Sequence, residues 1–155
     1  MLTVDFSDFP LLSSERLFFR ALAQTDIHEV FALRSDKEIM KYIPRPLAKN
    51  LDDAKEHIEV IQKTIQDNQG INWAITCKDK PGLIGIIGLY RINPEDYRCE
   101  LGYILLKEHH NKGYITEAIK PVLEFAFDVV GFHSVEAIID PDNSPSEKVL
   151  QKNGF

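Results

Sequence analysis

Hydrophobic and polar positions follow two different periods along this chain, and the changes of period separate strands from helices. Alternation with a period of two, or a short continuous apolar run, predicts a strand, whereas apolar residues three and four positions apart predict one side of a helix. The predicted strands cover residues 15–22, 72–77, 83–92, 97–105 and 135–139. The predicted helices begin near residues 25, 50, 113 and 144. The order is therefore strand, two helices, three strands, helix, strand, helix.

This order predicts how the strands pair. Three strands follow one another between residues 72 and 105 with no helix between them, which favours antiparallel neighbours. The strand–helix–strand unit at 97–139 favours a parallel pair with a right-handed crossover. The 83–92 strand is almost continuously apolar, so we expect it to be buried on both faces of the sheet. The sequence predicts an α/β fold with a mixed, mostly antiparallel sheet and helices on both faces.

Polar residues, glycine and proline predict where the helices begin and end. The candidate caps of the first two helices are Thr25, Asp26, Asn50 and Asp52. The second helix should stop near Asn68–Gly70, because glycine accepts the left-handed conformation of a helix end. The run Ser144-Pro145-Ser146-Glu147 is a capping box with proline at the first helical position, which predicts the start of the last helix. Pro121 lies inside the third helix and should kink it.

Composition and charge narrow the classes of function. The chain has 155 residues, the size of one domain, of which 44% are apolar and 27% charged. Its net charge of −6 argues against general binding to nucleic acid or to an anionic membrane. The N-terminus lacks the pattern of a signal peptide, and no apolar run approaches the ~20 residues needed to span a membrane. Cys77 and Cys99 fit reduced, buried thiols, so we expect a cytoplasmic protein.

A polar loop, HHNKGYIT at residues 109–116, separates the 97–105 strand from the third helix. A helix start has unpaired N–H groups and the positive end of the helix dipole, so it suits an anion. Gly113 lets a phosphate approach the backbone closely. We therefore expect a phosphorylated cofactor at this loop. The spacing of His109 and His110 offers no further ligand, so no metal site is expected.

Four segments of the chain resemble the GNAT superfamily of acyl-CoA N-acetyltransferases, and within it the group of ribosomal-protein-alanine N-acetyltransferases. The segments are ERLFFRAL with the Thr-Asp helix start, ELGYIL, NKGYITEA and NSPSEKVLQKNGF. They occur in the family's order and spacing across nearly all 155 residues. The resemblance implies one GNAT-like domain over residues 1–155, with acetyl-CoA as co-substrate.

The same resemblance implies that the domain is C-terminally short. Relatives continue after the NGF segment with two more strands, which complete the sheet and one wall of the acceptor site. We therefore expect this sheet to lack the last two strands. Either the chain is truncated, or another chain fills the gap, as in a homodimer, or the site is open.

The resemblance assigns the cofactor-binding residues as well. The family's pyrophosphate loop has the pattern Q/R-x-x-G-x-G/A, matched here at Gly113, with histidine and isoleucine at two of the other pattern positions. The residues that it implies for the loop are His110, Asn111, Lys112, Gly113, Tyr114, Ile115 and Thr116. The backbone N–H groups of residues 111–116 would hold the phosphates. The backbone of Tyr103, Ile104 and Leu105 would pair with the pantetheine arm. Asn143 matches an asparagine that contacts the cofactor.

The implied reaction is direct attack of a neutral amine on the thioester. An N-terminal amine with a pKa of about 7.7–8.0 needs only modest help from a base, whereas deprotonating a lysine with a pKa near about 10.4 costs about 4–5 kcal/mol. Glu100 is the candidate base, acting through water; its alternative is a solvated carboxylate at a strand end. Ser146 is the candidate donor to the thiolate; its alternative is helix capping. Many relatives use a tyrosine as the general acid on the last helix, where this chain has Leu150.

The sequence therefore predicts an acetyl-CoA-dependent N-acetyltransferase that acts on a primary amine, with a protein N-terminus as the first acceptor and a small amine as the second. The alternative is a catalytically silent acetyl-CoA-binding or regulatory module, which the altered loop, the missing tyrosine and the missing strands favour. A nucleotide-binding protein is a third possibility, but the loop lacks the Gly-Lys-Ser/Thr ending of a P-loop.

Overall fold

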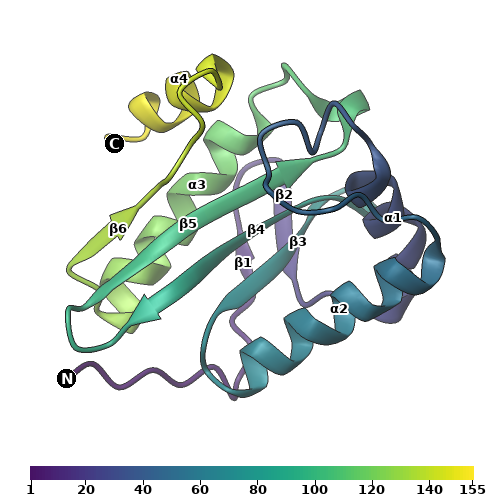
Figure 1. The fold of residues 1–155 in the computed structure, drawn as a ribbon. Coiled ribbons are helices and arrows are strands. Elements are labelled where there is room, and N and C mark those ends of the chain that lie inside the picture. Colours follow the sequence, from purple (N-terminus) through teal and green to yellow (C-terminus); the bar gives the residue numbers. More distant parts are fainter.

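Six strands form one sheet, which runs in sequence order from β1 to β6 (Figure 1). The computed structural model describes residues 1–155. The strands are β1 Leu12–Ser13, β2 Leu17–Arg20, β3 Ile71–Cys77, β4 Lys80–Asn93, β5 Arg98–Leu105 and β6 Ser134–Glu136. The helices are α1 Ile27–Ser35, α2 Leu51–Gln66, α3 Tyr114–Glu124 and α4 Ser144–Lys152. None of these helices combines the length and the apolar character needed to cross a membrane.

The strands pair as predicted. Neighbours from β1 to β5 are antiparallel, and β5 and β6 are parallel. The register places Tyr90 of β4 opposite Glu100 of β5, and Gly88 opposite Gly102. The connection between β5 and β6 contains α3. The predicted mixed, mostly antiparallel sheet is therefore confirmed.

Helices cover both faces of the sheet (Figure 1), and each face of the sheet has its own apolar cluster. Ile86 of β4 packs in the cluster that contains Ile58 of α2, on the face covered by α1 and α2. Its neighbour Ile87 packs in the cluster that contains Ile119 of α3. Consecutive strand residues point to opposite faces, so β4 contributes to both clusters. The predicted burial of this strand on both faces is confirmed.

Gly88 in the middle of β4 marks a close approach between two strands. A Cβ atom there would stand 2.5 Å from the carbonyl oxygen of Ile71, and closer still to the side chain of Asn72. Asn72 is itself 3% exposed, and its Oδ1 has no hydrogen-bond partner in the chain. Only glycine fits between these groups, because any side chain would displace backbone atoms.

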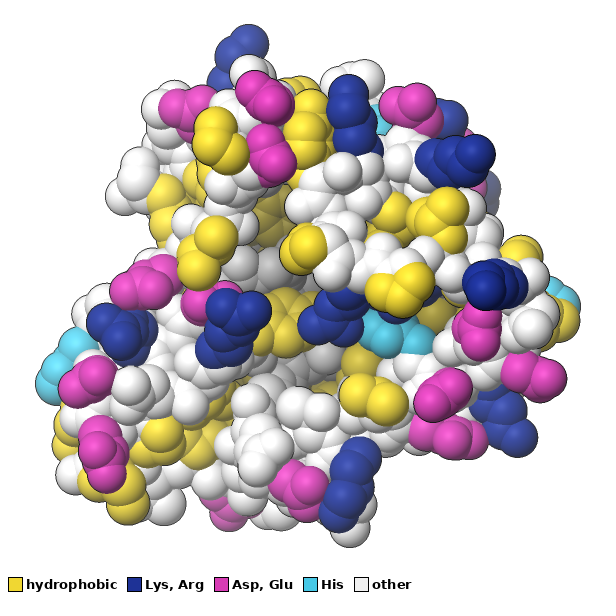
Figure 2. All heavy atoms as spheres, viewed as in Figure 1, with side chains coloured by type: hydrophobic (Ala, Val, Ile, Leu, Met, Phe, Trp, Pro, Cys, Tyr) yellow, Lys and Arg dark blue, Asp and Glu magenta, His cyan; other side chains and the backbone are white.

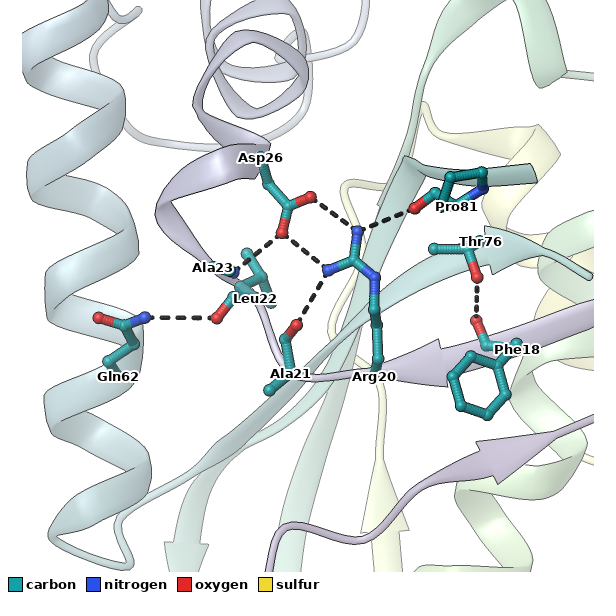
Figure 3. Close-up of polar contacts among 9 residues, drawn as sticks. All are labelled: Phe18, Arg20, Ala21, Leu22, Ala23, Asp26, Gln62, Thr76 and Pro81. Atoms are coloured by element: carbon teal, nitrogen blue, oxygen red, sulfur yellow. Dashed lines mark hydrogen bonds and ion pairs between the residues drawn. The ribbon is translucent and has the colours of Figure 1, made fainter.

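Asp26 connects three elements instead of capping α1 with its side chain. Its carboxylate accepts hydrogen bonds from Nη1 and Nη2 of Arg20, at 2.9 and 2.7 Å, and from the N–H of Ala23 at 2.9 Å (Figure 3). Arg20 also donates to the carbonyl of Pro81 at 3.1 Å. The pair therefore joins β2, the start of α1 and the start of β4. The helix does begin after Asp26, but the predicted side-chain cap is wrong because Arg20 occupies the carboxylate.

Two predicted helix boundaries also differ in their residues. After α2 the left-handed conformation is taken by Asn68, with φ 56°, and not by Gly70. The cap of α4 is Asn143, whose Oδ1 accepts a hydrogen bond from the N–H of Ser146 at 3.3 Å. Ser144 is therefore the first residue of the helix and not its cap. An asparagine side chain supplies the cap, and asparagine also tolerates a positive φ, so both shifts follow from ordinary asparagine chemistry.

One other prediction about the helices agrees with the structure, and the kink expected at Pro121 stays a prediction. Asn50 caps α2, because its Oδ1 accepts from the N–H of Asp53 at 3.0 Å. Pro121 lies inside α3, and the helix continues past it into a π-helical segment at Phe125–Val130. Gly131 then ends the helix with φ 95°. The helix therefore tolerates Pro121 and turns wider afterwards.

Candidate active site

The edge of β5 is open beyond the point where β6 leaves it. β6 pairs only with residues 98–100, whereas β5 continues to Leu105. The predicted pantetheine-binding residues Tyr103, Ile104 and Leu105 all lie in this unpaired part. The carbonyl oxygen of Leu105 is already used, because Nε2 of His110 donates to it at 2.8 Å. The remaining backbone groups at this edge can pair with an extended ligand, as an added strand would.

The loop before α3 offers a series of main-chain donors. Gly113 precedes the helix with φ 78°, and Asn111 also has a positive φ of 61°. No acceptor in the chain takes the N–H groups of residues 111–113. The N–H groups of residues 114–116 lie in the first turn of α3, where a helix has no acceptor of its own. Six consecutive N–H groups at a helix start form a suitable cradle for phosphate oxygens.

Glu117 and Arg16 anchor this loop to β2, and the sequence analysis did not identify their role. Glu117 accepts from Nε of Arg16 at 2.7 Å, from the N–H of Arg16 at 2.9 Å and from the hydroxyl of Ser14. Arg16 donates through Nη1 to the carbonyl of Lys112 at 3.0 Å, and its guanidinium lies 4.5 Å from the ring centre of Tyr114. Burial disfavours the ionised Glu117, but the hydrogen bonds from Ser14 and Arg16 outweigh it and lower its pKa. The anchor also places a guanidinium beside the cradle.

The two histidines of the loop contribute less to anion binding than their position suggested. His110 donates through Nε2 to the carbonyl oxygen of Leu105, so this ring nitrogen is not free for an anion. His109 lies 5.9 Å from the ring centre of Tyr114, and burial, with the charge of Lys112, lowers its pKa. The donors of the loop are therefore mainly the backbone N–H groups. Ile115 packs against the main apolar cluster, so its side chain has a place other than the cradle.

Ser146 meets a tyrosine from the sheet at the start of α4. The hydroxyl of Tyr103 forms a short hydrogen bond with the hydroxyl of Ser146 and lies 3.4 Å from its carbonyl oxygen. Burial raises the pKa of Tyr103, and the hydrogen bond with Ser146 opposes that rise. The ring of Tyr103 packs against the main cluster. Its hydroxyl, however, brings a phenol to the first turn of α4, the helix that carries Leu150.

Glu100 and Tyr103 point to opposite faces of β5. Glu100 lies on the side of α1 and α2, opposite Tyr90, and Arg91 is its ion-pair partner at 3.5 Å. Its side chain is 21% exposed, so the carboxylate is accessible but not fully solvated. Tyr103 belongs to the cluster on the α3 side. The candidate base and the candidate thiol-side donor therefore approach the open edge of β5 from different sides.

No group of three or more histidine, cysteine or carboxylate side chains in the structure is arranged to hold a metal ion. Both cysteines are free thiols. Burial, together with the charge of Glu100, raises the pKa of Cys99 to about 12, so this thiol is inert at neutral pH.

Comparisons with known proteins agree with this geometry. The family model described as an acetyltransferase (GNAT) domain matches residues 16–155. The chain is 31% identical over 147 residues to the uncharacterized N-acetyltransferase YoaA of Bacillus subtilis, covering 95% of this chain and 83% of that protein.

Two solved structures with bound coenzyme A have the same fold. The spermidine N-acetyltransferase from Vibrio cholerae, in complex with CoA and spermine, superposes with a TM-score of 0.79 at 24% identity, over 90% of this chain and 80% of that one. The ribosomal L7/L12 α-N-protein acetyltransferase RimL, in complex with coenzyme A, superposes with a TM-score of 0.84 at 15% identity, over 94% and 84% of the two chains. These matches confirm the predicted GNAT resemblance and fold.

Proposed function

The chain belongs to the GNAT acetyltransferase family, and from this premise we propose that it transfers an acetyl group from acetyl-CoA directly to a primary amine. The main support is the cradle of free N–H groups at residues 111–116, which lies next to the unpaired edge of β5. A cofactor in which a pyrophosphate is followed by an extended arm matches these two features in that order. Arg16 adds a positive charge beside Gly113, where it favours the phosphates.

Three residues would share the proton transfers. The bound co-substrate supplies a thioester carbonyl, the C–N bond to the amine forms there, and the C–S bond breaks. Glu100 takes the proton of the attacking amine, directly or through one water. Ser146 donates its hydroxyl proton toward the leaving sulfur, while the hydroxyl of Tyr103 donates to the oxygen of Ser146. This pair would fill the role of the tyrosine that is absent at Leu150.

Asn143 would act through the helix start and not by direct contact alone. Its side-chain oxygen accepts the N–H of Ser146, which fixes the first turn of α4. The orientation of the Ser146 hydroxyl depends on this turn. The amide NH₂ of Asn143 has no partner in the chain, so it is free to donate to the co-substrate.

The acceptor in this proposal is a primary amine, with a protein N-terminus first and a small amine second. The two CoA-bound structures with the same fold are named for one acceptor of each class, a ribosomal protein N-terminus and spermidine. An N-terminal amine has a pKa of about 7.7–8.0, so a weak base such as Glu100 is sufficient for it.

Thiol release tests this function. The protein is incubated with acetyl-CoA and a panel of peptides with free N-termini and small primary amines, and free thiol is followed over time. We expect thiol release that depends on at least one acceptor and falls at least tenfold in Glu100→Gln. Binding of acetyl-CoA by calorimetry without any thiol release would instead favour a silent binding module, and failure to bind would contradict both.

A further inference from the structure

Two arginines, Arg34 and Arg45, lie close enough on the acceptor side of the sheet for the charge of one to affect the other. Arg34 lies at the end of α1, and the segment after it folds back, because the N–H of Ala48 donates to the carbonyl of Arg34 at 2.9 Å. Arg45 lies on this returning segment. Residues 39–49 contain three basic side chains and no acidic one. Figure 2 shows basic side chains gathered around a hollow on this face, between α2 and the segment that precedes it.

Neither arginine has a partner. The side chains of Arg34 and Arg45 form no ion pair and no hydrogen bond in the chain. In contrast, Arg16 and Arg20 each bind a carboxylate. Arg34 is half-buried, and burial, together with the charge of Arg45, lowers its pKa. Two adjacent like charges without a counter-ion are unfavourable in the free protein, and an anion would relieve that repulsion.

Two titratable groups that the arginines influence, Tyr90 and His57, carry no negative charge. Burial raises the pKa of Tyr90 to about 12, although Arg45 and Arg34 oppose the shift, so its hydroxyl is a neutral donor. Burial, with the charges of the two arginines, lowers the pKa of His57 on α2 to about 4, so its ring is neutral at pH 7. Neither group therefore neutralises the two guanidinium groups, and the carboxylate of Glu100, opposite Tyr90, is already paired with Arg91.

This basic hollow lies on the same side of the sheet as the candidate base. Tyr90 is opposite Glu100 in the β4–β5 register, and the ring of Tyr90 covers Gly102, where a Cβ atom would stand 2.7 Å from it. The phosphate cradle belongs to α3, on the other side. The arginine pair is thus placed to meet the acceptor and not the pyrophosphate.

We infer that Arg34 and Arg45, assisted by the hydroxyl of Tyr90, form an anion subsite that selects acceptors carrying a carboxylate or phosphate group in addition to the reacting amine. This inference rests on the proposed function, because it assigns a substrate class to the same site. Such a subsite disfavours polyamine acceptors, since a polycation would be repelled by two guanidinium groups that have no counter-ion.

Matched acceptors that differ only in the anionic group test the subsite. The first pair is a tetrapeptide amide with a free N-terminus that carries either glutamate or glutamine at its second position. The other two pairs are the free amino acids glutamate and glutamine, and phosphoethanolamine and ethanolamine. Spermine serves as the polycation. We expect the anionic member of at least one pair to have a kcat/KM at least tenfold higher, and spermine to be among the poorest acceptors. The pair that shows the preference identifies whether the anion belongs to a peptide, a small amino acid or a phosphate.

Variants then assign the preference to the arginine pair. In Arg34→Gln/Arg45→Gln, the KM for the anionic acceptor should rise at least tenfold, while the KM for acetyl-CoA and the thermal melting temperature stay near those of the wild type. Lys55→Gln/Lys63→Gln removes two exposed charges from α2 and is the matched control, which should keep the preference. Equal use of charged and neutral acceptors by the wild type, or an unchanged preference in the arginine variant, would overturn the inference while the proposed function stands.

The two proposals also fail in different ways. If no acceptor releases thiol, the proposed function fails. The anion subsite is then tested separately, by the binding of the acidic tetrapeptide without any reaction. That binding is followed by NMR at the ring of His57. An anion between the arginines should raise the pKa of this histidine in the wild type and not in the arginine variant; no shift in the wild type would contradict the subsite.

Discussion

The two sides of β5 offer different kinds of groups for the binding that we propose. On the α3 side, the phosphate cradle consists of backbone N–H groups at residues 111–116, and its geometry depends on Gly113 and on the Arg16–Glu117 anchor. On the α1–α2 side, the proposed subsite consists of side chains, those of Arg34, Arg45 and Tyr90, whose charges influence one another. A backbone site tolerates sequence change as long as the loop keeps its conformation. A side-chain site changes its ligand with each substitution, so one fold can keep its co-substrate and exchange its acceptor.

The largest expected effect is a loss of stability from a substitution in the middle of β4, on the acceptor side of the sheet. Gly88→Ala places a Cβ atom 2.5 Å from the carbonyl oxygen of Ile71, where the backbone cannot give way. We expect a loss of about 3 kcal/mol in the free energy of unfolding, measured by urea denaturation. Gly82→Ala is the control, because a Cβ atom there meets nothing within 4 Å and should change stability by less than about 0.5 kcal/mol. Similar midpoints for the two variants would contradict the close approach at β4.

The next largest effect is expected when the contact between Glu117 and Arg16 on the cofactor side is removed. Glu117→Gln removes the charge that Arg16 and Ser14 share, and we expect a loss of about 2 kcal/mol at pH 7. The pKa of Glu117 is lowered in the folded protein, so its contribution is present above the ordinary glutamate pKa and disappears as the pH falls through the lowered value.

A surface ion pair is the control for this anchor. Asp67→Asn removes the exposed partner of Lys63 and should cost less than about 0.5 kcal/mol. Denaturation curves at pH 7 and pH 3 make the comparison. Equal losses for Glu117→Gln and Asp67→Asn at pH 7 would show that the anchor is no stronger than a surface pair.

A smaller expected effect, on kcat, distinguishes the roles of the two hydroxyls near α4. If Tyr103 acts through Ser146, Ser146→Ala should lower kcat about tenfold and Tyr103→Phe about fivefold, and the double variant should be no slower than Ser146→Ala alone. The measurement is the steady-state rate of thiol release with saturating acetyl-CoA. Multiplicative losses in the double variant would mean that the two hydroxyls act independently.

The smallest effect is a titration on the acceptor side. The ring of His57 should titrate near pH 4, mainly because it is buried, and its pKa should rise partway in Arg34→Gln/Arg45→Gln, because two like charges are removed while the burial remains. A histidine with a lowered pKa stabilises the fold above pH 6.5, and this contribution is lost as the pH falls from 6.5 to about 4. NMR of the histidine ring protons gives both values. An unchanged pKa would place the arginines too far from His57 to share one site.

The helix start after Gly113 was predicted correctly from the sequence, because local chemistry determines where a helix begins. Contacts between side chains far apart in the chain were not predicted. Arg34 and Arg45 were not identified, since they meet only when the segment between α1 and α2 folds back. Glu117 was missed for the same reason: its partner Arg16 lies 101 residues away in the chain.

The fold was predicted for a similar reason. Alternation and apolar runs gave the strands and their mixed pairing, because they reflect burial on one or two faces. Errors occurred where two residues competed for one role. Asn143 capped α4 in place of Ser144, and Arg20 occupied the carboxylate of Asp26. Competition of this kind depends on tertiary contacts and is invisible to local patterns.

Calorimetric titration of acetyl-CoA tests the central claim most directly, namely that the co-substrate binds the backbone cradle and not the arginine side. Gly113→Ala forces a left-handed conformation on a residue with a side chain, at a cost of about 1–2 kcal/mol, so we expect the Kd to weaken about tenfold. Arg34→Gln/Arg45→Gln should bind acetyl-CoA with the affinity of the wild type. If the arginine variant loses affinity as strongly as Gly113→Ala, or if Gly113→Ala binds normally, the division of the site between the two sides of β5 is wrong.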